Sequence, residues 1–131
     1  MKSLIIDATS EKIFLVIINS KNIYTSSHKN SKINFDKLTI LIDRFLSKHN
    51  IFFDQIKIIY VNRGPGSFAG TRASLSIVKG IHLSKKIDYF GFSFLDFVDE
   101  INKRNVKWIE LPKLCKKYKI KKNLIKPLYL S

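Results

Sequence analysis

The residues with the clearest chemical potential form a glycine-rich segment, 62–70, with the sequence NRGPGSFAG. We expect it between a strand and the start of a helix, where unpaired backbone N–H groups and the helix dipole favour an anion. Its spacing is G-x-G-x-x-x-G with no lysine after the last glycine, so neither the Walker A nor the usual dinucleotide pattern is met. One interpretation is a phosphate site. We favour the other, a tight loop that needs glycine dihedrals and close packing, and assign to it Gly64, Pro65, Gly66, Ser67, Phe68, Gly70 and the nearby Arg72.

Other candidate catalytic groups are few. The three histidines, His28, His49 and His82, are far apart, and none begins an H-x-x-x-H or H-E-x-x-H pattern, so no metal site is predicted. Ser67 lies in a P-G-S-F context instead of the G-x-S-x-G nucleophile elbow, which gives no support to a hydrolase. We therefore predict no catalytic residue, no metal ligand and no enzyme activity of the chain's own.

An α/β framework is expected to position these residues. Short apolar, β-branched runs predict strands, and apolar residues at helical spacing predict helices. The order is strands first, then alternating helices and strands, which indicates a mixed sheet flanked by helices. Strands are expected at 3–9, 13–19, 22–27, 56–61 and 87–92, and helices at 35–49, 71–84, 93 onward and 111–120.

Two helix starts carry cap signals. Asn34 is the predicted N-cap of the helix at 35–49. Ser93 and Asp96 have the spacing of a capping box at the start of the third helix. The buried side of that third helix is predicted to consist of Phe94, Phe97, Val98 and Ile101.

The composition favours one globular domain with a strong positive charge. The chain has 131 residues, of which 45% are hydrophobic and 26% charged, and its formal net charge is +14. Such a charge favours polyanionic partners such as tRNA, or an acidic protein face. The alternative is a lysine-rich surface that is merely solvated. The basic residues gather after residue 103, and the candidate tRNA-binding side chains are Lys116, Lys117, Lys119, Lys121 and Lys122.

The single cysteine, Cys115, has no internal partner for a disulfide. No basic and apolar leader precedes the first expected strand, and no apolar run approaches the roughly 20 residues of a membrane helix. We therefore expect a cytoplasmic protein without a membrane span.

Four segments together resemble one family. The segment GPGSFAGTR is similar to the GPGSFTGxR motif of the TsaB (YeaZ-like) family, which takes part in tRNA threonylcarbamoyladenosine biosynthesis. The segments LIIDATS at 4–10, GFSFLDFV at 91–98 and KPLYLS from Lys126 also resemble TsaB segments. The resemblance implies a single actin/Hsp70-like (ribonuclease H-like) lobe at 1–104, with a basic C-terminal segment at 105–131 packed on it. TsaB proteins are usually longer, so the resemblance indicates a shortened form that lacks most of a second lobe, and Asn34 stands where the family has a histidine.

The resemblance also implies partners. TsaB proteins are non-catalytic activators of the transferase TsaD, which they contact through helices that correspond to 35–49 and 71–84. A TsaE-like ATPase and tRNA would join through the complex, and a homodimer in isolation stays an open alternative. No cofactor of its own is expected, because ATP and magnesium would be bound mainly by the partner. The predicted partner-binding residues are Leu38, Ile40, Leu41, Phe45, Ser74, Ile77, Val78 and Ile81.

Two other functions stay open. The chain could act as a small basic tRNA-binding module through the segment after residue 103. It could also bind a nucleotide, because Asp7 stands where nucleotide-binding members of the superfamily place an aspartate near the phosphates. A structural role for Asp7, capping the first turn, is the interpretation that we favour.

Overall fold

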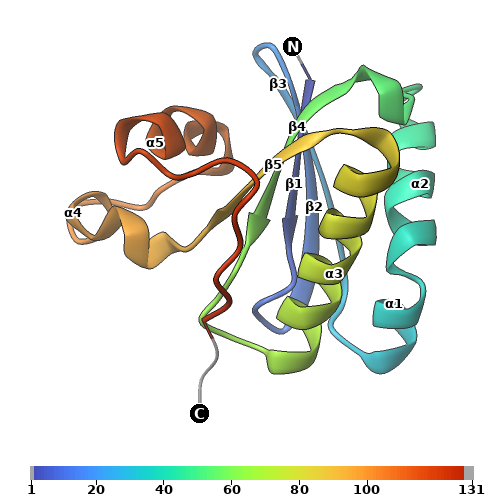
Figure 1. Cartoon of the computed structure of the whole chain (residues 1–131), viewed down its shortest axis with the longest axis horizontal. Coiled ribbons are helices and arrows are strands. Elements are labelled where there is room, and N and C mark those ends of the chain that lie inside the picture. Colours follow the sequence, from blue (N-terminus) through green and yellow to red (C-terminus); the bar gives the residue numbers. More distant parts are fainter. Residues whose placement is uncertain (1, 129–131) are drawn as a thin grey trace.

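A five-stranded mixed sheet forms the centre of the protein in the computed structural model, which describes residues 2–128 (Figure 1). The spatial order is β3-β2-β1-β4-β5. The first three strands form an antiparallel meander, and β4 and β5 continue the sheet parallel to β1. The expected α/β class is confirmed. The strands are β1 (Lys2–Asp7), β2 (Lys12–Asn19), β3 (Asn22–Lys29), β4 (Ile56–Asn62) and β5 (Asp88–Phe92).

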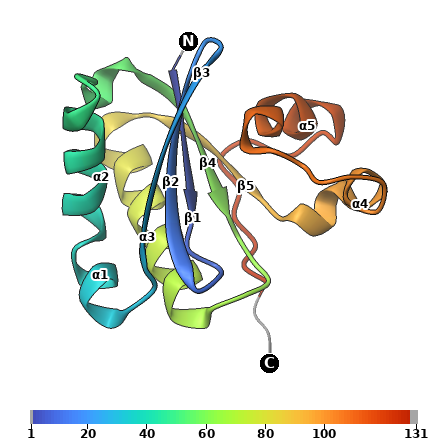
Figure 2. The same cartoon turned by 180° about the vertical axis from the view of Figure 1, so that it is seen from behind.

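Helices cover both faces of the sheet. One layer holds α1 to α3 and the other holds α4 and α5, as Figure 2 shows from behind. Short 3-10 turns precede β4, α4 and α5, at Phe53–Gln55, Phe94–Phe97 and Trp108–Glu110. The helices are α1 (Lys32–Asp36), α2 (Leu38–Lys48), α3 (Phe68–Lys85), α4 (Val98–Ile101) and α5 (Leu111–Lys117).

Each face of the sheet has its own hydrophobic core, which explains why the central strands β1, β2 and β4 have nearly continuous apolar sequences. Alternate residues of β1 point to opposite faces: Leu4 and Ile6 belong to the core under α2 and α3, and Ile5 belongs to the core under α5. Leu111 and Leu114 of α5 are buried in the second core. The basic segment therefore contributes apolar side chains to the fold as well as charge.

The predicted helix at 35–49 is corrected in its start. The chain forms a short α1 first, and Ser31, not Asn34, is its N-cap, since the Ser31 hydroxyl oxygen accepts the backbone N–H of Asn34 at 3.3 Å. The Asn34 side chain instead donates to the carbonyl oxygen of Lys29 at 2.7 Å. Ser31 has the extended backbone that an N-cap requires, and the helix restarts as α2 after Lys37.

The other helix predictions are confirmed in part. Ser93 and Asp96 do form a capping box, in which the Asp96 carboxylate accepts the Ser93 N–H at 2.8 Å. The helix that follows is a 3-10 turn and the single turn α4. Phe97 is buried as predicted, but Val98 is 47% exposed. The prediction assumed an α-helical period, which would put Phe97 and Val98 on one side of a helix, whereas residues 94–97 form a 3-10 turn with a different period.

The residues after α5 return along the edge strand β5, and we call residues 119–128 the strap. Asn123 donates its N–H to the Tyr89 carbonyl at 2.8 Å and accepts the Tyr89 N–H at 2.9 Å through its side chain. Its amide also donates to Asp88 at 2.9 Å, which is the main cause that holds the Asp88 pKa below its ordinary value. The strap therefore covers the outer edge of the sheet (Figure 1). The last residues of the KPLYLS segment, 129–131, lie outside the described residues.

The thiol of Cys115 is enclosed between α5 and the sheet. It is buried in the second core, and this burial, with a smaller effect of the Asp96 charge, raises its pKa to about 12 from 9.0. The Cys115 thiol has its ordinary pKa of 9.0 only in the unfolded chain, so between pH 9 and 12 it loses its proton more readily on unfolding. The free energy of unfolding therefore falls as the pH rises above about 9 toward 12.

We expect Cys115 to resist alkylation in the native chain at pH 8. A pKa of about 12 leaves about a thousandfold less thiolate than an ordinary cysteine has, and the thiolate is the nucleophile. Iodoacetamide labelling followed by mass spectrometry measures this, and the chain unfolded in guanidinium is the control that reacts fully. Stoichiometric labelling of the native chain within minutes would contradict the buried position.

Candidate functional site

The glycine-rich segment packs against the turn that follows β1. Ser67 donates its N–H to the Thr9 carbonyl at 2.8 Å, and a Cβ on Gly66 would lie 2.2 Å from the same oxygen. A Cβ on Gly70 would lie 2.2 Å from the Ala8 carbonyl oxygen. Gly64 has a φ of 107°, a backbone region that other residues rarely adopt. These contacts support the structural loop over the phosphate site.

The boundary of this loop is corrected. Ser67 is the N-cap of α3, and its hydroxyl oxygen accepts the Gly70 N–H at 3.2 Å. Phe68 and Gly70 therefore belong to the first turn of α3, three residues before the predicted start. Arg72 lies one turn further, with its guanidinium 5.8 Å from the centre of the Phe68 ring, and Pro65 is exposed.

Asp7 ends β1 beside this loop and is held by protein donors. One carboxylate oxygen accepts the N–H of Thr9 at 3.0 Å and its hydroxyl at 2.7 Å, and the other accepts the Asn62 amide at 3.0 Å. The Asn62 side chain in turn accepts the Gly64 N–H at 2.9 Å. Asp7 is 5% exposed. A carboxylate with three protein donors fits the structural role, in which it joins β1, β4 and the loop.

The histidines are not brought together. His28 lies 2.7 Å from a serine hydroxyl of its own strand, His49 stacks on Tyr24, and His82 donates to a backbone carbonyl at 3.0 Å. Among residues 2–128, no group of three or more His, Cys, Asp or Glu side chains is placed to hold a metal ion. No helix in this part of the chain is long and apolar enough to cross a membrane.

The predicted partner-binding residues separate into two groups. Five of them are buried in the chain's own core, where they hold α2 and α3 on the sheet, so they are not available to a partner in this structure. The prediction is corrected for Leu38, Phe45, Ser74, Val78 and Ile81. Ile40 is 49% exposed, on the side of α2 opposite these core residues, and Leu41 and Ile77 are half-buried.

Other exposed apolar residues lie in the same helical layer and were not predicted to contact a partner. Ile33 on α1 is 65% exposed, and Phe68 at the start of α3 is 53% exposed. The helices α1, α2 and α3 contact one another, so Ile33 and Phe68 lie on helices that adjoin the one carrying Ile40. Ile33 was missed because residues 32–36 were not expected to form a helix of their own.

The candidate tRNA-binding lysines also separate. Lys117 pairs with Glu100 at 2.6 Å, and this hydrogen bond is the main cause that lowers the Glu100 pKa. Lys122 pairs with Asp88 at 3.4 Å. Lys116, Lys119 and Lys121 are exposed. The ion pairs fasten α5 to α4 and the strap to β5, which gives two of the five lysines a local structural use.

Comparisons with known proteins agree with the fold. A family model described as "TsaD: tRNA N6-adenosine threonylcarbamoyltransferase" matches residues 28–115. The structure of YeaZ from Pseudomonas aeruginosa matches 70% of this chain and 43% of its own, with a TM-score of 0.65 and 17% identity. At that identity the likeness shows the fold alone, and it agrees with the expected mixed sheet flanked by helices.

Two curated relatives carry the same description, "tRNA threonylcarbamoyladenosine biosynthesis protein TsaB". The one from Buchnera aphidicola subsp. Schizaphis graminum (strain Sg) is 30% identical over 95 residues, which cover 72% of this chain and 45% of the relative. The one from Buchnera aphidicola subsp. Baizongia pistaciae (strain Bp) is 34% identical over 71 residues, 47% of this chain and 32% of the relative. The chain thus spans less than half the length of the curated relatives that it matches.

Proposed function

Because this chain belongs to the TsaD family, as a TsaB-like (YeaZ-like) member, we propose that it is a non-catalytic partner of a TsaD-type transferase in tRNA N6-threonylcarbamoyladenosine biosynthesis. In this proposal the TsaD-type subunit transfers the threonylcarbamoyl group to adenosine, with its own ATP and magnesium. The present chain binds that subunit and holds it in a competent state, and a TsaE-like ATPase and tRNA meet the assembled complex.

The surface around Ile40 is the observation that supports a binding role most directly. Ile40 on the outer side of α2 is 49% exposed, so its burial against a partner removes further apolar area from water. The family match covers α1 to α3 completely, so this surface lies in the part of the chain that the family model matches. The glycine-rich loop and Asp7 support the same proposal indirectly, since their contacts fix α3 to the end of the sheet.

Co-purification with the TsaD-type subunit of the same organism tests the proposal. We expect a complex that survives size-exclusion chromatography at micromolar concentrations of both proteins. The measurement belongs in low salt and again in 0.5 M salt, because an interface built on apolar contacts persists when charges are screened. No complex at micromolar concentrations in low salt would contradict the proposed function.

A further inference from the structure

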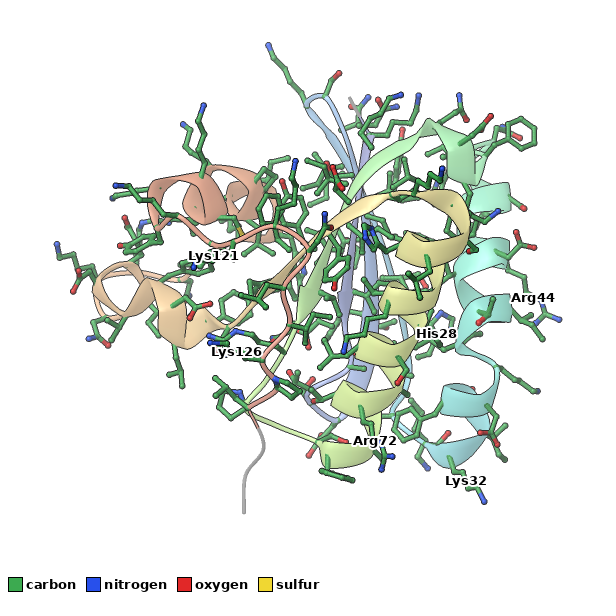
Figure 3. The ribbon with its side chains drawn as sticks, in the orientation of Figure 1. His28, Lys32, Arg44, Arg72, Lys121 and Lys126 are labelled. Atoms are coloured by element: carbon green, nitrogen blue, oxygen red, sulfur yellow. The ribbon has the colours of Figure 1, made fainter. Side chains whose placement is uncertain are left out.

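A second feature of the molecule is a pocket between the end of β4, the edge strand β5 and the strap. Its polar lining consists of Arg63, Asp96, Lys119, Lys121 and Lys126. The lining therefore contains four cationic side chains and one carboxylate. Figure 3 shows Lys121 and Lys126 on the strap, on the side of the molecule away from Lys32, Arg44 and Arg72. Residue 63 and the strap lysines are far apart in the sequence and meet only because the strap returns along β5.

Arg63 is the fixed group of this pocket. Its guanidinium donates to the backbone carbonyl oxygen of Lys126 at 3.0 Å and to the Asp96 carboxylate at 2.6 Å. The Arg63 and Asp96 side chains are both only 18% exposed. Asp96 also caps Ser93, so its position is set by the fold. These bonds hold the guanidinium in place, and a guanidinium carries five N–H donors in a planar fork that matches phosphate oxygens.

The strap lysines supply uncompensated charge. Within residues 2–128, Lys119, Lys121 and Lys126 have no carboxylate within ion-pair distance, in contrast to Lys117 and Lys122. Asp96 neutralises one of the four cations, and the pocket keeps a net charge of about +3 by formal count. A bound anion lowers the electrostatic repulsion among the cationic side chains that share the pocket. The structure thus distinguishes the three unpaired lysines of the pocket from the other lysines of the basic segment, which the sequence does not.

We propose that this pocket binds a backbone phosphate of tRNA. A phosphodiester offers oxygens to Arg63 and the lysines, and the adjoining ribose meets the apolar wall that Ile120 and Leu124 form. The choice of tRNA as the polyanion rests on the proposed function. The ligand chemistry, a phosphate group, follows from the cationic lining of the pocket. The pocket adds Arg63 and Lys126 to the tRNA-binding residues, and it leaves Lys117 and Lys122 to structural pairing.

A salt series of tRNA binding tests this pocket. The full chain binds a fluorescently labelled tRNA transcript, and anisotropy gives the affinity from 50 to 300 mM salt, chosen as a range in which counterion release is measurable. The pocket variant combines Lys119→Ala, Lys121→Ala and Lys126→Ala. We expect about tenfold weaker binding near 0.1 M salt, and a slope of log K against log salt that is shallower by about 1, because the pocket contacts one phosphate.

The control variant loses the same charge elsewhere. It combines Lys21→Ala, Lys48→Ala and Lys79→Ala, three exposed lysines outside the pocket. We expect its affinity to stay within about twofold of the parent protein. A third variant, which combines Lys119→Arg, Lys121→Arg and Lys126→Arg, keeps the charge and should keep the binding. Equal losses in the pocket and control variants, or no loss in the pocket variant, would overturn the proposal.

The same variants separate this proposal from the proposed function. Complex formation with the TsaD-type subunit is measured in parallel, and the pocket variant should form the complex as the parent protein does, because the strap runs along the β5 edge of the sheet, away from α2 (Figure 1). Loss of tRNA binding with an intact complex supports the pocket. A missing complex with the parent protein would contradict the proposed function and leave the tRNA result to stand by itself.

Discussion

We expect Gly70→Ala to lower the free energy of unfolding by about 3 kcal/mol, a loss at the upper end of those for overpacked sites. The added Cβ would lie 2.2 Å from the Ala8 carbonyl oxygen, and its next contacts, at 3.1 and 3.2 Å, are with the Asn30 side chain. That amide bonds the Ala8 carbonyl at 3.0 Å, so neither neighbour moves without loss of a hydrogen bond. Relief requires α3 to shift away from the turn after β1. Thermal unfolding followed by circular dichroism should show a melting temperature about 10 °C lower.

Gly80→Ala is the matched control in the same helix. A Cβ on Gly80 meets nothing within 4 Å, so the substitution only replaces a poor helix former with a good one. We expect it to raise the free energy of unfolding by about 0.5 to 1 kcal/mol. If Gly70→Ala is as harmless as Gly80→Ala, then the close packing of the loop against residues 8–9 is wrong. A phosphate site would then be favoured over a tight structural loop as the interpretation of the glycine-rich segment.

Much of the framework could be predicted because its signals are local. The apolar runs of β1, β2, β4 and β5 identify themselves by composition, since a strand buried on both faces has no polar alternation to obscure it. The capping box of Ser93 and Asp96 is a contact between residues three apart, so its spacing is visible in the sequence. The order of the elements then limits the topology to a small set, of which the observed sheet is one.

The helix errors arose where two local signals compete. Asn34 and Ser31 are both good N-caps, and the choice depends on the backbone that the end of β3 imposes on the chain. The helical period of α2 placed Leu38 and Phe45 on one side but could not decide whether that side faces the sheet or a partner. The structure decides it by burial, and among the apolar residues of α2 only Ile40, off the stripe, is exposed.

The basic pocket could not be predicted from the sequence, for a different reason. Arg63 and the carbonyl of Lys126 are 63 residues apart, and no periodicity links them. The sequence indicated the positive charge of the last segment, but not which lysines are paired with carboxylates and which are free. Glu100 and Asp88 reach their lysines only through the packing of α5 and the strap. Long-range electrostatics of this kind depend on the finished fold. They are therefore the part of the site that a structure adds.

We expect Ile40→Asp to weaken binding of the TsaD-type subunit by about a hundredfold, the size of effect that marks a hot spot. If Ile40 is buried in the proposed complex, the substitution replaces an apolar contact with a carboxylate that lacks a partner, and an unpaired buried charge costs more than the lost contact. The monomer should keep its stability within about 0.5 kcal/mol, because the side chain is 49% exposed in the free chain. Isothermal titration calorimetry measures the affinity, and thermal unfolding checks the fold.

Val98→Asp is the control for this prediction, since it makes the same kind of change at a similar exposure. Val98 is 47% exposed and lies on α4, in the helical layer on the other face of the sheet. Both variants lower the net charge by one, so long-range attraction changes equally. We expect the Val98 variant to bind within about twofold of the parent protein. Equal weakening by both variants would indicate a charge effect. Unchanged binding by the Ile40 variant would place the partner on another surface, because a carboxylate introduced into an apolar contact must lower the affinity.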